Sequence, residues 1–265
     1  MPYTAEISRV NPTAFVFLID QSASMAEPFA AGTGQTKAGG TADAINRLLQ
    51  ELSIKCAKEG GVRDYFHVAV IGYGARVAPA FSGKLKGREL VPIGEVATSP
   101  ARIDQRVRRE DDGAGGLLER TVKFPVWFEP MAEGGTPMTA ALTRVRGVVQ
   151  AWLSRHPGCF PPIVINITDG ESTDGDPSTV AEEIRLQTSA DGPVLLLNAH
   201  LSSEGGRSIS FPDSDAGLPN DHARLLFRMS SFLPRYMQEI LADDGRRTSD
   251  GPGGPLGEAA RAHVL

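Results

Sequence analysis

The chain has 265 residues, of which 41% are hydrophobic and 22% charged, and its formal net charge is -5. This length allows one large or two small domains with a sizeable core. The composition is that of an ordinary globular protein, and a mildly acidic charge provides no general attraction to nucleic acid or to an anionic membrane surface.

Neither targeting nor cysteine chemistry is indicated by the sequence. The first residues lack the basic and long apolar regions of a secretory signal, and no apolar run approaches the roughly 18 residues of a membrane span. Cys56 and Cys159 are the only cysteines and are far apart, which favours buried thiols in a reducing compartment. We therefore expect a cytoplasmic protein that does not contact membranes.

The first half of the chain begins with an arm, residues 1–12, and then a buried strand. Six apolar residues, 14–19, run into Asp20, and a short apolar run of this kind is typical of a parallel strand covered on both faces. A helix is predicted at 41–58, with Thr41 as its N-cap. The segments that follow are predicted as a strand at 65–73, an edge strand around 89–92, a helical segment at 100–110 and an extended segment at 122–128.

The second half continues the alternation of helices and strands. Thr136 is a predicted N-cap, and Met138, Leu142, Val145, Val149 and Trp152 trace one apolar helical stripe behind it. We then expect a strand at 159–168, a helix at 177–187, a strand at 193–201 and helices at 223–229 and 231–241. Residues 243–265 are predicted to be a flexible tail. The pattern predicts one Rossmann-like, doubly wound α/β domain at 13–242, with three α/β/α layers and a mainly parallel sheet.

Oxygen-bearing side chains gather at three loops of this predicted sheet. Asp20, Ser22 and Ser24 follow the first strand, Thr136 begins a helix, and Asp169 follows the strand ending at Thr168. In a doubly wound sheet these loops meet at the carboxyl ends of neighbouring strands. Each residue alone is explained by a cap or a turn. Together they favour a site for a hard cation, because carboxylate and hydroxyl oxygens are what such cations bind.

The sequences DQSAS, GGTPM and TDG, in this order, resemble the metal-ion-dependent adhesion site of the von Willebrand factor type A domain. The resemblance spans about residues 13–241 and implies the strand order 3-2-1-4-5-6 with bound Mg²⁺ or Mn²⁺, Ca²⁺ being a third option. It implies that Ser22, Ser24 and Thr136 lie next to the metal, and that Asp20 and Asp169 act largely through water. Residues 27–40, 80–126 and those after 243 have no counterpart in the family.

This donor set leads to a hypothesis about function. Three neutral hydroxyls and two carboxylates leave the charge of Mg²⁺ incompletely neutralised, so an acidic residue from a protein partner can complete its shell. Small stand-alone bacterial members of the family are associated with stress-response or defence assemblies. We therefore expect a metal-dependent adaptor that binds a protein partner, and not an enzyme.

Two alternatives remain open. The chain could be a scaffold that binds partners without a metal. It could also be a Mg²⁺-dependent phosphohydrolase, since a buried strand ending in an acid is typical of haloacid dehalogenase-type enzymes. Those enzymes have a second acid two residues after the nucleophilic aspartate, where this chain has Ser22, so the general acid is missing.

Overall fold

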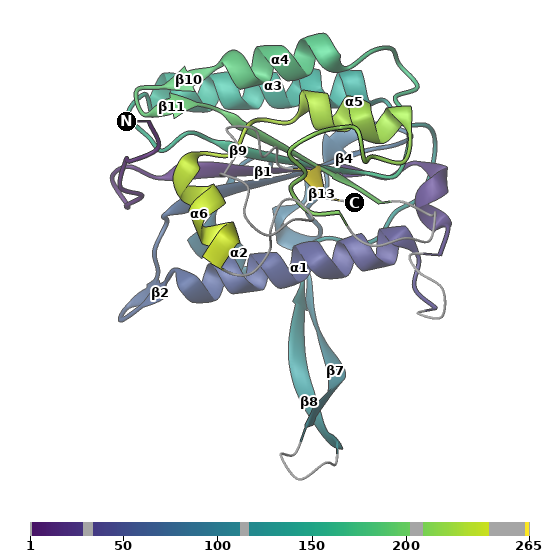
Figure 1. The fold of residues 1–265 in the computed structure, drawn as a ribbon. Coiled ribbons are helices and arrows are strands. Elements are labelled where there is room, and N and C mark those ends of the chain that lie inside the picture. The colour runs from purple at the N-terminus through teal and green to yellow at the C-terminus, as the bar shows by residue number, and fades with distance from the viewer. Residues whose placement is uncertain (1, 29–33, 112–116, 202–208, 244–262, 265) are drawn as a thin grey trace.

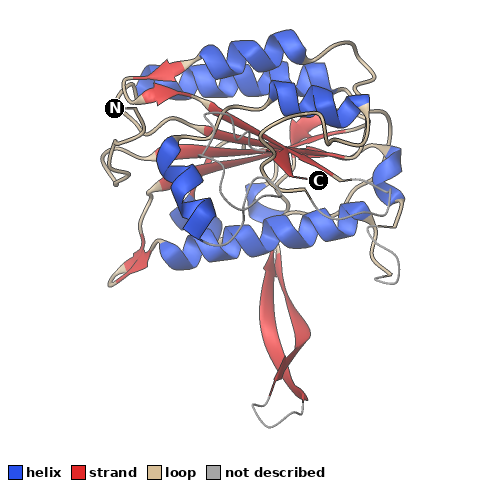
Figure 2. Cartoon of the chain, viewed as in Figure 1, coloured by secondary structure: helices blue, strands red, loops and turns tan. Residues whose placement is uncertain are grey.

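The structure is a computed structural model that describes the chain except for residues 1, 29–33, 112–116, 202–208, 244–262 and 265. A central sheet lies between two layers of helices, and one hairpin projects from the body (Figures 1 and 2). This arrangement confirms the expected three-layer α/β fold. None of the described helices combines the length and apolar character needed to span a bilayer.

Seven strands form the central sheet, in the order β13-β12-β9-β1-β4-β5, with β6 also paired to β4. The pairs among β13, β12, β9, β1 and β4 are parallel, while β5 and β6 run antiparallel to β4. Numbered along the chain, the six strands of the main path have the order 3-2-1-4-5-6, as the family resemblance implies. The strands are β1 (Thr13–Asp20), β4 (Phe66–Tyr73), β5 (Val77–Pro79), β6 (Val91–Pro92), β9 (Ile163–Thr168), β12 (Leu195–His200) and β13 (His263–Val264).

Alternate residues of the strands fill two cores, one on each face of the sheet. Val16 and Leu18 of β1 face the core under α3, α4 and α5, whereas Phe17 and Ile19 face the core under α1 and α2. Because both faces are covered, the central strands are apolar along their whole length. The helices are α1 (Lys37–Lys55), α2 (Ile93–Thr98), α3 (Met138–Arg155), α4 (Ser178–Leu186), α5 (Asp221–Met229) and α6 (Arg235–Asp243), with short 3-10 turns η1 (Ala23–Ala26) and η2 (Gly83–Leu85).

Most predicted elements are present with small shifts at their ends. The apolar stripe of α3 is buried as expected. Its N-cap is Pro137 instead of Thr136, and the strand predicted from residue 159 begins at Ile163. Small antiparallel ladders join β2 (Ala57–Lys58) to β3 (Gly61–Val62) and β10 (Thr188–Ser189) to β11 (Gly192–Pro193). Most of the predicted flexible tail lies outside the described residues.

The prediction that α1 begins at residue 41 was wrong. The helix begins at Lys37, because the Thr36 hydroxyl accepts a hydrogen bond from the Gly39 backbone N–H at 3.0 Å and thereby caps the first turn. Two glycines in that turn have low helix propensity. The cap and the packing of the following turns outweigh that cost, and the earlier start brings Lys37 into the helix.

The prediction of a helix at residues 100–110 was also wrong. Residues 102–111 form strand β7 (Arg102–Asp111), which pairs antiparallel with β8 (Leu117–Val126) over ten residue pairs. The extended segment predicted at 122–128 is confirmed as far as Val126. In β7, Ile103 and Val107 share one face of the ribbon and are more than half exposed. Pairing with the next strand along the chain decided this conformation, and the helical pattern of residues 100–110 does not reveal that ladder.

Candidate metal centre

The candidate site lies where two neighbouring parallel strands end. Asp20 is the last residue of β1, Asp169 directly follows β9, and the two strands pair in register up to Ile19 and Ile167. Since the chain places β4 on one side of β1 and β9 on the other, this is the position at which the strand order reverses. Crevices at such switch points are where open α/β sheets bind ligands.

The Asp20 carboxylate is buried and holds the first loop in place. Its Oδ1 accepts a hydrogen bond from the Ser22 backbone N–H at 2.8 Å, and its Oδ2 accepts one from the Thr168 hydroxyl at 2.6 Å. Burial raises the pKa of Asp20, and the hydrogen bonds from Ser22 and Thr168 oppose that rise. Both oxygens are thus engaged by protein donors, which suits an acid that acts on a metal through water.

The hydroxyls and Asp169 form a row of oxygens. The Ser22 and Ser24 oxygens share a hydrogen bond at 3.0 Å, and the Ser24 hydroxyl donates to Asp169 Oδ1 at 2.8 Å. Neighbouring ligands of an octahedral Mg²⁺ lie about 2.9 Å apart when each is about 2.05 Å from the ion. The two oxygen–oxygen distances along Ser22, Ser24 and Asp169 therefore match the lengths of two adjoining edges of such an octahedron.

The loop that carries Thr136 is tied to both other loops. Gly134 accepts a hydrogen bond from the Ala23 N–H at 3.0 Å, and the Thr136 N–H donates to the Thr173 hydroxyl at 3.0 Å. A side chain at Gly170 would place its Cβ 3.7 Å from the Thr136 hydroxyl oxygen and 3.9 Å from that of Ser24. The structure thus brings all five predicted residues to one place, and their binding of a metal stays a prediction.

The sequence analysis missed two charged residues at the site, Lys37 and Glu27. The Lys37 ammonium donates to Asp169 Oδ2 and to Glu27 Oε2, each at 2.8 Å, and its side chain is 2% exposed. Desolvation lowers the pKa of Lys37, but the hydrogen bonds to Asp169 and Glu27 outweigh it, so the net pKa is raised. A lysine in the first turn of an amphipathic helix was the available signal, and it required the correct start of α1.

The donor set fits a hard divalent cation better than a softer metal ion such as Zn²⁺ or Cu⁺. Among the described residues there is no cluster of three or more His, Cys, Asp or Glu that could hold a metal ion. The candidate centre depends instead on hydroxyl oxygens with two carboxylates, which suits Mg²⁺ or Mn²⁺. The one feature that opposes a cation is the Lys37 charge beside Asp169.

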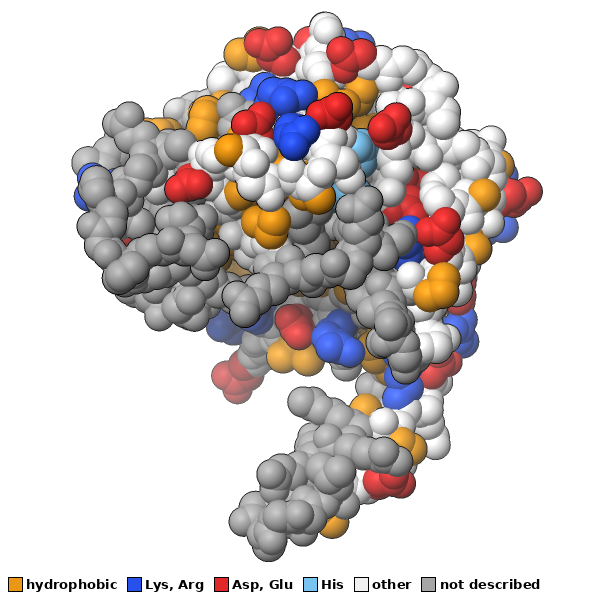
Figure 3. Space-filling model, turned by 45° about the vertical axis from the view of Figure 1, so that its right-hand side comes forward, with side chains coloured by type: hydrophobic (Ala, Val, Ile, Leu, Met, Phe, Trp, Pro, Cys, Tyr) orange, Lys and Arg blue, Asp and Glu red, His pale blue; other side chains and the backbone are white. Residues whose placement is uncertain are grey.

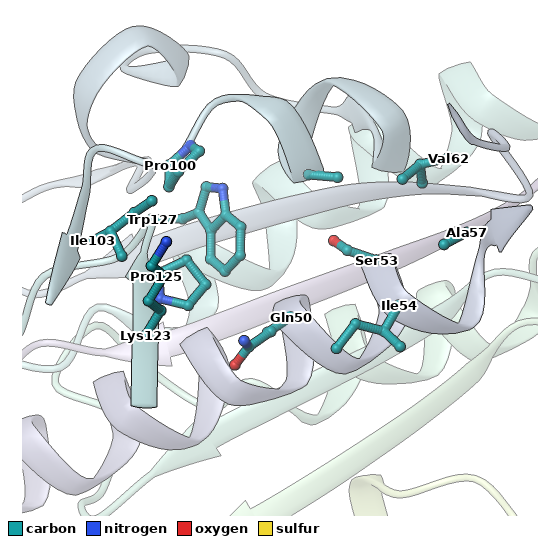
Figure 4. A pocket seen from close by; sticks show the side chains of 11 residues that line it. Gln50, Ser53, Ile54, Ala57, Val62, Pro100, Ile103, Lys123, Pro125 and Trp127 are labelled. Carbon is teal, nitrogen blue, oxygen red and sulfur yellow. The ribbon is translucent and has the colours of Figure 1, made fainter. Parts of the chain in front are cut away.

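A second concave region lies at the base of the projecting hairpin, away from the strand ends. A pocket of about 350 Å³ opens between α1 and the hairpin, and Figure 4 shows the Trp127 ring between them. It is mainly apolar; Lys123 is its only charged lining residue. On the face shown in Figure 3, acidic and basic side chains are interspersed over the described surface.

Comparisons with known proteins give a structural likeness only. No protein-family model matches the sequence, and no curated protein matches it. The chain is similar to the vWF domain of the type V pili tip protein Mfa5 from Porphyromonas gingivalis, with 15% identity, a TM-score of 0.34, and coverage of 61% of this chain and 39% of that one. It is also similar to the human COPII-coat protein Sec24c, with 13% identity, a TM-score of 0.33, and coverage of 74% and 26%. The chain therefore spans well under half of either protein.

Proposed function

We propose that this chain is a von Willebrand factor A-like module that binds Mg²⁺ or Mn²⁺ and, through the metal, an acidic residue of a protein partner. The observation that carries the proposal is the row of oxygens from Ser22, Ser24 and Asp169, spaced at 2.8 and 3.0 Å. The metal would be held by these residues and Thr136, with Asp20 behind them. When bound, it would supply a Lewis-acidic position open to a partner carboxylate.

Each residue of the candidate site would have its own role in this function. Ser22 and Ser24 would supply neutral oxygens that leave the cation's charge largely available to the partner. Asp20 would orient the loop, because its two carboxylate oxygens hold the Ser22 N–H and the Thr168 hydroxyl. Thr136 would contribute from a third loop that is hydrogen-bonded to the other two.

One observation favours a second candidate, a scaffold that binds its partner without a metal. The Lys37 ammonium already forms an ion pair with Asp169. The charge of this carboxylate is therefore balanced without a metal ion. An enzymatic role is disfavoured by Ser22, whose hydroxyl bonds to Ser24 at the position where a phosphohydrolase of the haloacid dehalogenase type needs an acid. We also propose a cytoplasmic location and a part in a bacterial stress-response or defence assembly.

Calorimetry with Mg²⁺ and Mn²⁺ tests metal binding directly. We expect binding by the native chain and none by Asp20→Asn, while Asp176→Asn serves as a matched control in a neighbouring loop. Partner capture from the native host, with Mg²⁺ and with a chelator, then separates the two candidates. Proteins retained only with Mg²⁺, and lost with Asp20→Asn, support the metal-dependent module; the same proteins retained in chelator contradict it.

A further inference from the structure

Lys37 is a buried charge placed where a helix does not favour it. It is the first residue of α1, and the first turn of that helix contains no acidic residue. The positive end of the helix dipole and the loss of hydration both disfavour an ammonium group there. The cost is offset by two ion pairs of 2.8 Å with Asp169 and Glu27. Lys37 is therefore stabilised by its two acidic partners and not by the helix.

The ammonium and the hydroxyl cluster share one carboxylate. Asp169 is fully buried, its Oδ2 accepts from Lys37, and its Oδ1 accepts from Ser24. A divalent cation held by Ser22, Ser24 and Asp169 would lie on the same carboxylate as the lysine. Two like charges on one buried carboxylate repel strongly, because a buried site screens them poorly. The lysine ammonium and the divalent ion therefore weaken each other's binding to Asp169.

Glu27 is a second ion-pair partner for the Lys37 ammonium, independent of Asp169. Glu27 is 55% exposed, and its backbone carbonyl accepts the Lys37 N–H at 2.9 Å, so the base of the lysine stays next to Glu27 whatever its ammonium contacts. The ammonium can leave Asp169 while it keeps Glu27, at the cost of one ion pair and without movement of the helix.

We propose that Lys37 is an internal cation of the metal centre, which neutralises Asp169 in the metal-free protein and is displaced from Asp169 when the divalent ion binds. This inference rests on the proposed function. It makes Lys37 the residue that sets cation affinity: the lysine keeps the loops ordered without metal and weakens metal binding. A partner carboxylate that completes the metal shell then has to overcome this competition, which couples metal retention to partner binding.

The test compares charge-removing and charge-keeping variants by calorimetry with Mg²⁺ and Mn²⁺. Lys37→Met and Lys37→Gln both remove the charge, and the glutamine keeps a hydrogen-bond donor for Asp169 if the methionine variant does not fold. We expect both to bind about tenfold or more tightly than the native chain, since removing a competing charge strengthens a buried electrostatic site. Lys37→Arg keeps the charge and should bind within about twofold of the native chain. Lys55→Met, which removes an exposed charge from the last turn of α1, should do the same.

The outcomes separate this inference from the proposed function. If the native chain binds the metal and the neutral variants bind no more tightly, the inference is overturned and the metal-dependent module stands. If only the neutral variants bind, the lysine does compete, and the native chain is not a metal-dependent module. If no variant binds, both proposals fail, and Lys37 is a structural counter-ion of Asp169.

Discussion

The candidate metal centre and the base of the β7–β8 hairpin are built by opposite means. At the centre, buried charges and hydroxyls bond to one another across three loops, and Asp20, Asp169 and Lys37 all have close polar partners. At the hairpin base, Trp127 and Phe128 are buried in an apolar core, while Ile103 and Val107 farther along the ribbon are more than half exposed. We infer that the first region serves binding and that the base of the second serves stability.

Asn46 is a buried polar residue that connects the hairpin base to the body. The Asn46 side chain on α1 accepts hydrogen bonds from the Trp127 and Phe128 backbone N–H groups at 2.8 and 3.0 Å, and donates to the Phe128 carbonyl at 2.8 Å. The chain leaving the hairpin therefore has its backbone groups satisfied within the core. The hairpin beyond this point packs little against the body (Figure 1).

The largest expected effect is on Trp127, which tests whether the hairpin base is structural. Its ring is buried, and its indole N–H donates to the Val96 carbonyl at 2.6 Å. Trp127→Ala should lower the free energy of unfolding by about 3–5 kcal/mol, through a cavity and a lost hydrogen bond. Denaturant titration measures this change. Ile103→Ala, in the same pocket but 57% exposed, should cost less than about 1 kcal/mol, and equal losses would contradict the assignment.

The next largest effect tests the other region. Mg²⁺ at about a hundred times its dissociation constant should stabilise the fold by about 2.7 kcal/mol, because it binds only the native state. For a domain of this size that raises the melting temperature by roughly 5–10 °C, which differential scanning calorimetry detects. Asp20→Asn should remove the shift, and Ile103→Ala should retain it. A shift that survives in Asp20→Asn would place the ion elsewhere.

Burial at the metal-centre end also predicts a pH dependence. Desolvation lowers the pKa of His222, while Glu171 and Asp169 oppose that change. An imidazole with a lowered folded pKa takes up its proton more readily in the unfolded chain. Its contribution to stability is therefore complete above about pH 6.5 and is lost as pH falls below that value, by up to about 1.4 kcal/mol per unit.

Stability curves from pH 7.5 to 5.5 check this prediction. His222→Phe should reduce the slope and leave a remainder from His67 and His156, because desolvation also lowers the pKa of each. An unchanged slope in His222→Phe would show that the other histidines account for the whole dependence.

The smallest effect should come from shortening the hairpin. Residues 105–123 can be replaced by Asn-Gly, which joins the paired residues Asp104 and Phe124 through a two-residue turn. The change removes the ion pair of Arg106 with Asp43, whose side chains are 36% and 30% exposed, and the stacking of Arg106 on Phe124. Partly exposed ion pairs of this kind contribute little. We expect a change within about 1 kcal/mol and an unaltered Mg²⁺ shift. A large loss of stability would show that the ribbon, and not only its base, supports the fold.

Sequence reasoning worked best where the signal was local and apolar. The run from Ala14 to Ile19 identified β1, and the stripe from Met138 to Trp152 identified α3, because burial on a sheet or a helix imposes a fixed period. The five candidate ligands were found from two strand ends, one helix start and the resemblance of their motifs to a metal-ion-dependent adhesion site. Whether they bind a metal is still a prediction.

The failures share one cause, which is a contact with another segment that the local pattern does not show. Arg102–Asp111 is a strand because it pairs with Leu117–Val126. Lys37 belongs to the site because Asp169, 132 residues later, accepts a hydrogen bond from its ammonium group. Neither contact leaves a periodic trace near the residue concerned.

Outside the hairpin, the amino-acid order alone is enough to predict the alternation of helices and strands, the buried strands and the oxygen-rich loops, since each depends on propensity and burial over a few residues. Only the folded chain shows that a buried lysine pairs with Asp169 of those loops, and that the hairpin is tied to α1 through Asn46. Electrostatic contacts depend on distances in space, and those distances exist only once the sheet has brought distant strands together.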